Sequence, residues 1–133
     1  MKSILISILM VVAVLSGISS CATVPTGPLA AGEVRLLGMD VSGSIRMGHL
    51  FVLNINFETD DKPEIRTACF YWSGEGPYCF KVMAVKYGSP GTIKVEPRAR
   101  DSGWYMMESY VLYIRDGKTQ QTKAISSQIY VYP

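Results

Sequence analysis

From Glu33 to the end of the chain, hydrophobic residues recur at alternate positions, and this alternation restricts the fold more than any other feature of the sequence. In the segment 49–57, four large hydrophobic residues share one face, while polar residues such as Asn54 point the other way. Side chains of a β-strand alternate in this manner, whereas no window of eleven or more residues has the spacing of a helix. The chain is therefore predicted to be all-β.

Further strands are expected at 68–72, 92–96, 104–115 and 125–132, which are rich in β-branched and aromatic residues. Segments containing Gly, Pro and Asp separate them and favour turns. Six or seven short strands in about 100 residues are typical of a sandwich. The prediction for residues 33–133 is an antiparallel β-sandwich of about seven strands.

The amino-terminal residues have the pattern of a signal peptide. Lys2 supplies a positive charge, and the apolar stretch Ile4–Leu15 has twelve residues, too few for the roughly 20 that a membrane-spanning helix needs. The sequence Ile18-Ser19-Ser20-Cys21 then resembles the lipobox of bacterial lipoproteins. The resemblance implies that residues 1–20 are removed and that the Cys21 sulfur carries a diacylglycerol. A secretory signal followed by an unmodified Cys21 is the alternative.

Residues 21–32 are predicted to be the lipidated cysteine and a flexible tether. Positions 22–32 read ATVPTGPLAAG, with two prolines, two glycines and no charge, and would span about 36 Å when fully extended. Ala22 follows the cysteine, where Asp would resemble an inner-membrane retention signal. We therefore expect attachment to a bilayer through acylated Cys21, in the outer membrane and facing the periplasm.

Asp40, Ser42 and Ser44 spell the D-x-S-x-S motif, which resembles the metal-ion-dependent adhesion site of von Willebrand factor A-type domains. Those domains are larger α/β folds in which distant loops supply further ligands, and that scaffold is missing from this all-β pattern. No metal is predicted. Instead, Gly38 and Gly43 indicate a strand that kinks or changes sheets, with Asp40 and Ser42 capping a turn.

Two cysteines remain after lipidation, Cys69 and Cys79, in an oxidising compartment. Folding the segment as a hairpin about Gly74 places Cys69 opposite Cys79 and Trp72 opposite Gly76. Directly opposed residues of an antiparallel pair are close enough for a disulfide. A cross-strand disulfide on the outer side of the hairpin is predicted. A redox-active pair is the alternative, although nine intervening residues are far from a C-x-x-C spacing.

The segment Asp101–Met107 resembles the D-x-G-x-Y-x-C segment of immunoglobulin-type domains, in which the tyrosine forms a corner. Tyr105 occupies the tyrosine position, while Met107 replaces the cysteine, so the usual inter-sheet disulfide is absent. An apolar methionine can fill that core position. The spacing from Trp72 to Tyr105 departs from the family pattern. The resemblance implies an immunoglobulin-like or fibronectin-like sandwich, and simple core packing of Tyr105 is the alternative.

The hairpin tip is the candidate binding loop. Tyr71, Trp72, Glu75 and Tyr78 are interleaved with Gly and Ser, as in aromatic-anchored loops that bind other molecules. The disulfide would brace the base of this loop. Because Trp72 and Tyr78 fall on the core face of the pattern, the alternative is that they only close the end of the sandwich.

Catalysis has little support in the sequence. His49 is the only histidine, no catalytic motif occurs, and the acidic residues between Glu58 and Glu64 surround a proline-containing turn. A net charge of +2 without a basic stripe argues against nucleic-acid binding. We therefore expect no enzyme, cofactor or metal, but a non-catalytic module that binds an envelope protein or polymer. A purely structural lipoprotein and a small periplasmic enzyme or inhibitor are the alternatives.

Overall fold

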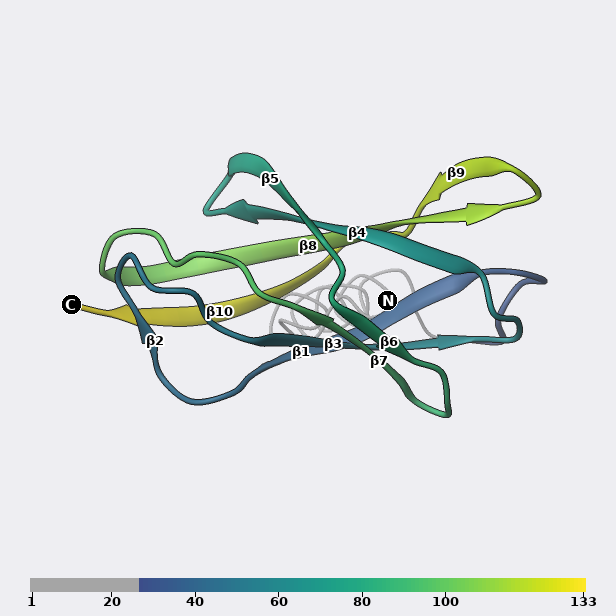
Figure 1. The fold of residues 1–133 in the computed structure, drawn as a ribbon, viewed down its shortest axis with the longest axis horizontal. Helices are drawn as coiled ribbons and strands as arrows, with labels where there is room; N and C mark the ends of the chain where they lie inside the picture. The colour runs from purple at the N-terminus through teal and green to yellow at the C-terminus, as the bar shows by residue number, and fades with distance from the viewer. Residues whose placement is uncertain (1–26) are drawn as a thin grey trace, which may run out of the picture.

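The computed structural model describes residues 27–133, which form two β-sheets and no helix (Figure 1). The four-stranded sheet A has the order β1 (Val34–Val41), β3 (Leu53–Thr59), β7 (Gly91–Val95), β6 (Ala84–Lys86). The six-stranded sheet B has the order β2 (Ile45–Arg46), β10 (Ile125–Tyr132), β8 (Gly103–Arg115), β4 (Glu64–Trp72), β5 (Glu75–Lys81), and β9 (Lys118–Gln121) pairs with β8. The expected signal peptide, Cys21 and the first part of the tether lie outside the described residues.

The all-β prediction is confirmed, and the number of strands differs from it. The described chain has ten strands rather than about seven. The additional ones are β2, β6 and β9, with two, three and four residues, which is too short for alternation to be visible in the sequence. All pairs are antiparallel except that of β2 with β10.

The strand expected at 49–57 begins only at Leu53. Before it, Leu50 forms an isolated bridge with Arg98, and the Phe51 amide donates to the Pro97 carbonyl over 3.0 Å. The first four residues of the expected strand are therefore irregular, although the alternation there is real. Phe51 is buried, so the hydrophobic pattern reported its burial and not its secondary structure.

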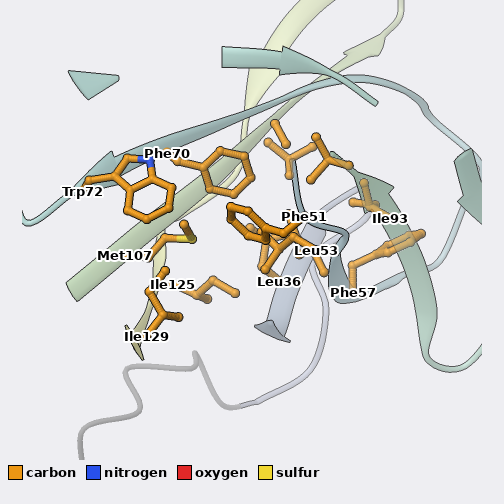
Figure 2. Close-up of a cluster of buried hydrophobic side chains, with 14 of the residues drawn as sticks. Leu36, Phe51, Leu53, Phe57, Phe70, Trp72, Ile93, Met107, Ile125 and Ile129 are labelled. Carbon is orange, nitrogen blue, oxygen red and sulfur yellow. The ribbon is translucent and has the colours of Figure 1, made fainter. Parts of the chain in front are cut away.

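The core lies between the two sheets, and both contribute large side chains to it (Figure 2). Leu53, Ile55 and Phe57 of β3 are fully buried, as the alternation predicts. Each such side chain contributes roughly 1.5–3 kcal/mol when removed from water. Met107 is also fully buried, at the position where the immunoglobulin pattern has a cysteine.

Between β1 and β2 the chain changes sheets, as the glycines predicted. The register of β1 on β3 shifts between Leu36 and Gly38, and Gly43 has a φ of 78° in the connection to β2. The expectation that Asp40 and Ser42 cap this turn locally is wrong. Asn side chains of β3 bond to them instead: Asn56 Nδ2 donates to Asp40 Oδ2 over 3.2 Å, and Asn54 Nδ2 donates to Ser42 Oγ over 3.4 Å.

The two-sheet domain has two distinct ends. At the proximal end, where the chain enters β1, the Arg115 guanidinium at the end of β8 lies directly over Gly32. At the distal end, the last residues of β1 and β10 line a groove of about 340 Å³, and the Met47 amide donates to the Tyr132 carbonyl over 2.8 Å. In Figure 1 the β8–β9 turn marks the proximal end at the right, and the C-terminus marks the distal end at the left.

Candidate interaction surface

The β4–β5 hairpin turns through Ser73 and Gly74, whose φ angles are 49° and 87°. Positive φ at both central residues is the mark of a type I′ turn, which matches the twist of hairpin strands. Cys69 pairs with Cys79, as predicted. Trp72 pairs with Glu75 rather than Gly76, because the register shifts between Phe70 and Trp72.

The predicted disulfide is confirmed. Cys69 and Cys79 are bridged, with their Cα atoms 4.1 Å apart. Ala68 and Phe70, the chain neighbours of Cys69, belong to the hydrophobic core cluster, and Cys69 does not. The bridge therefore lies on the outer face of sheet B. Cys69 is nonetheless fully buried, while Cys79 is exposed.

Trp72 does not form part of an accessible loop. Its side chain is only 2% exposed and packs edge-on against Phe51 and Tyr105, with ring centroids 6.0 and 5.2 Å away. This is the arrangement expected if Trp72 closes the end of the sandwich. Tyr71 lies on the outer face instead, where its ring is 6.2 Å from that of Tyr110 on β8.

The other two residues of the candidate loop, Glu75 and Tyr78, interact with Arg100 from the β7–β8 loop. The Arg100 guanidinium lies 2.7 Å from Glu75 Oε1 and 4.9 Å above the Tyr78 ring, and the Tyr78 hydroxyl donates to Glu75 over 3.2 Å. Desolvation acts to lower the pKa of Arg100, but the charge and hydrogen bond of Glu75, together with Tyr78 and Tyr105, raise that pKa overall. The hairpin tip is thus attached to its own domain.

Exposed hydrophobic side chains gather beside the hairpin tip, at the distal end, where the Ser73 amide donates to the Met106 carbonyl over 2.8 Å. Trp104 is 67% exposed, and its ring lies 5.0 Å from that of Tyr130, which in turn lies 4.8 Å from that of Tyr132. We call this patch the distal surface, and it comprises the half-buried Tyr130 and five exposed residues: Met47, Leu50, Trp104, Met106 and Tyr132. Of the large hydrophobic residues exposed within 27–133, Met83 alone lies away from it.

The distal surface was not predicted, although the sequence contains a signal for it. In β8, Met107 and Tyr105 occupy inward positions, so the alternation places Trp104 and Met106 on the outer face. Outward positions of a solvated sheet are normally polar. A tryptophan and a methionine at consecutive outward positions therefore indicate an exposed hydrophobic patch, whose other members come from β10 and the β2–β3 connection.

The residues considered for catalysis are not gathered into a site. Within residues 27–133 no three His, Cys, Asp or Glu side chains are placed to hold a metal ion, and His49 is exposed. Each acid around the β3–β4 turn has a structural partner: Glu58 pairs with Arg35, Asp60 accepts from the Gly32 amide, Asp61 accepts from the Lys62 amide, and Glu64 pairs with Arg66.

Across the described part of the chain, no helix is long and apolar enough to cross a bilayer. No protein family, curated protein or solved structure matches the chain. Function is therefore inferred from the residues and their geometry.

Proposed function

We propose that the protein is a lipid-anchored lipoprotein of a bacterial envelope, and that its sandwich is a non-catalytic module that binds another envelope protein. One observation carries this proposal. The chain enters the domain at the proximal end, whereas the exposed hydrophobic side chains gather at the distal end. An anchor at one end and an apolar patch at the other suit a protein that is held on a membrane and meets its partner away from it.

The anchor rests on the sequence around Cys21. Cleavage before this cysteine leaves six residues, 21–26, ahead of the described part of the chain. Each buried acyl CH₂ contributes about 0.8 kcal/mol, so several acyl chains hold a protein on a bilayer without a membrane-spanning helix. Ala22 favours the outer membrane, where the domain would face the periplasm.

We also propose an immunoglobulin-like topology. The order β1-β3-β7-β6 corresponds to strands A, B, E and D of such domains, and β10-β8-β4 corresponds to G, F and C. Two further features support this assignment. The Tyr105 hydroxyl donates to the Asp101 carbonyl over 2.7 Å, as in a tyrosine corner, and Trp72 on β4 lies opposite Met107 in the register.

The distal surface has the composition of a protein-binding site. Trp and Tyr are enriched at the energetic centres of interfaces, and methionine adapts to the shape of a partner. Arg46 lies beside Tyr132 in the β2–β10 register, is exposed and has no ion-pair partner within residues 27–133. The expected partner is a protein that presents an apolar patch with a carboxylate placed to meet Arg46.

Site-specific crosslinking in living cells tests this surface. A photo-reactive amino acid at position 104 is compared with one at position 83, since Met83 is equally apolar and 56% exposed but lies outside the distal surface. We expect one discrete protein adduct from position 104, none from position 83, and a weaker adduct when Arg46→Glu is added. Equal adducts from both positions, or none from position 104, would favour a purely structural lipoprotein.

The anchor is tested separately. Metabolic labelling with a palmitate analogue is expected to label the wild-type protein and not the Cys21→Ser variant. An unmodified N-terminal peptide in the mature wild-type protein, identified by mass spectrometry, would contradict lipidation without affecting the result at position 104.

A further inference from the structure

The last part of the expected tether is bound to the domain. Arg35 is only 7% exposed, and its guanidinium donates to the carbonyls of Gly27 over 2.6 Å and Pro28 over 3.2 Å. Glu33 and Glu58 each lie 3.2 Å from the same guanidinium and hold it in place. A buried arginine with two carboxylate partners is a rigid donor, because its planar fork loses little further freedom on bonding.

The residues after Pro28 form a turn that is fixed in the same way. The Glu33 amide donates to the Ala30 carbonyl over 3.0 Å, and the Ala30 amide donates back to the Glu33 carboxylate over 2.9 Å. The Gly32 amide donates to Asp60 Oδ1 over 3.0 Å. A Cβ at Gly32 would lie 0.5 Å from Arg115 Nη1, so the arginine covers this glycine directly.

We propose that these three side chains, Arg35, Asp60 and Arg115, act as a clamp that shortens the tether and thereby sets which end of the domain faces the membrane. This inference rests on the proposed lipidation of Cys21. The six residue steps from Cys21 to Gly27 reach about 20 Å at most, against the 36 Å or so of an unclamped tether. The proximal end is therefore held within about 20 Å of the lipid surface.

The length of the sandwich completes the orientation. Strand β8 has 13 residues, which at about 3.3 Å each extend about 40 Å from the proximal to the distal end. The domain is thus about twice as long as the free part of the tether. The distal surface, which includes Trp104, is presented on the side of the domain that faces away from the lipid.

Charge at the proximal end neither strengthens nor opposes this orientation. Its turns and strand ends carry five basic and five acidic residues, so there is no net attraction to anionic lipid. They are Lys62, Lys86, Arg115, Lys118 and Lys123, and Glu33, Asp60, Asp61, Glu64 and Asp116. The clamp is therefore the feature that decides the orientation.

Energy transfer to the lipid surface tests the inference on the acylated full-length protein in vesicles that contain an acceptor lipid. A donor dye is attached through Thr119→Cys at the proximal end or Ser102→Cys at the distal end, both of which are exposed. We expect more transfer from position 119 than from position 102. Arg35→Gln should lower the transfer from position 119, because the released tether reaches about 36 Å instead of about 20 Å.

Arg66→Gln is the matched control, since it removes the same charge from an exposed pair with Glu64 and should leave the transfer unchanged. Asp60→Ala removes only the acceptor for Gly32 from an exposed turn, and should lower the transfer from position 119 even if Arg35→Gln impairs folding. Equal transfer from the two positions in the acylated wild-type protein would overturn the inference.

Hydrogen exchange separates failure of the clamp from failure of the anchor. The Gly32 and Glu33 amides should exchange more slowly than the exposed amide of Ala31 in the wild-type protein, and lose this protection in Arg35→Gln. Unprotected amides in an acylated protein overturn the clamp alone. An unacylated Cys21 overturns the proposed anchor and, with it, the orientation.

Discussion

The hydroxyl of Tyr105 donates a 2.7 Å hydrogen bond to the carbonyl of Asp101, four residues earlier, and so attaches the start of β8 to the loop before it. Tyr105→Phe removes this bond but keeps the ring that packs against Trp72. We expect the free energy of unfolding to fall by about 1 kcal/mol, the usual net value of a hydrogen bond. Urea denaturation measures this, and an unchanged midpoint would contradict the prediction.

Removing the disulfide should lower the free energy of unfolding by more than the Tyr105→Phe substitution does. The chain-entropy estimate for a loop this short is roughly 2–3 kcal/mol. The double variant Cys69→Ala, Cys79→Ala should therefore unfold at lower urea concentration than the oxidised protein. The sheet should persist, because β4 also pairs with β8 along its length. Reduction of the wild-type protein should lower the urea midpoint in the same way. A urea midpoint that does not change with reductant would contradict the prediction.

Gly91 should not tolerate a side chain. A Cβ there would lie 2.6 Å from the Phe57 ring and 2.9 Å from the Lys86 carbonyl, and both neighbours are held by sheet A. Gly91→Ala is expected to destabilise the domain by about 1–3 kcal/mol, the range for overpacking. Gly38→Ala is the control, since nothing lies within 4 Å of its Cβ position. In thermal unfolding, the midpoint temperature should fall for Gly91→Ala and stay unchanged for Gly38→Ala.

Ser109 on β8 is fully buried, and its hydroxyl has no hydrogen-bond partner within residues 27–133. An unsatisfied buried hydroxyl is unfavourable, so its removal recovers the desolvation cost. Ser109→Ala is therefore expected to leave the free energy of unfolding unchanged or to raise it by up to about 1 kcal/mol. A clear loss of stability in urea would mean that the hydroxyl has a partner after all.

The turn between Ala30 and Glu33, which lies beside the clamp, should loosen in acid. The hydrogen bond from the Ala30 amide lowers the pKa of Glu33 from 4.5, against the opposing effect of desolvation, and the charges of Arg35 and Lys123 add to the lowering. A lowered pKa in the folded state means that the stabilisation is complete above pH 4.5 and is lost as the pH falls through the lowered value. The Ala30 amide resonance should titrate with a midpoint below 4.5. Glu33→Gln should abolish this titration. A midpoint above pH 4.5 for the Ala30 amide in the wild-type protein would contradict the prediction.

Alternation in the sequence was enough to predict an all-β chain. It reports which side of a strand is buried. Cys69 and Cys79 were paired by assuming a hairpin about Gly74; the chain turns through Ser73 and Gly74 instead, and the register shift between Phe70 and Trp72 restores the predicted pairing. The predicted pairing was wrong at Trp72, which lies opposite Glu75 and not Gly76 because of this register shift. A bulge changes the pairing without changing the pattern of burial, so the sequence carries no signal for it.

The candidate site was less predictable than the fold. The composition of the hairpin tip predicted a binding loop, yet Trp72 is in the core and Glu75 is paired with Arg100, 25 residues away. The clamp could not be predicted from the sequence either, because the Gly32 amide bonds to Asp60, which lies 28 residues further along the chain. Contacts of this kind depend on which strand ends meet in space, and local sequence patterns do not encode that.

The position of Pro133 has a practical consequence. Tyr132 belongs to the distal surface, and its carbonyl bonds to the Met47 amide, so any polypeptide attached after Pro133 leaves the domain in the middle of this patch. A carboxy-terminal affinity tag would therefore mask the surface that a partner needs. The exposed turn at Asp116 and Gly117, at the opposite end of β8, is the safer place for an epitope.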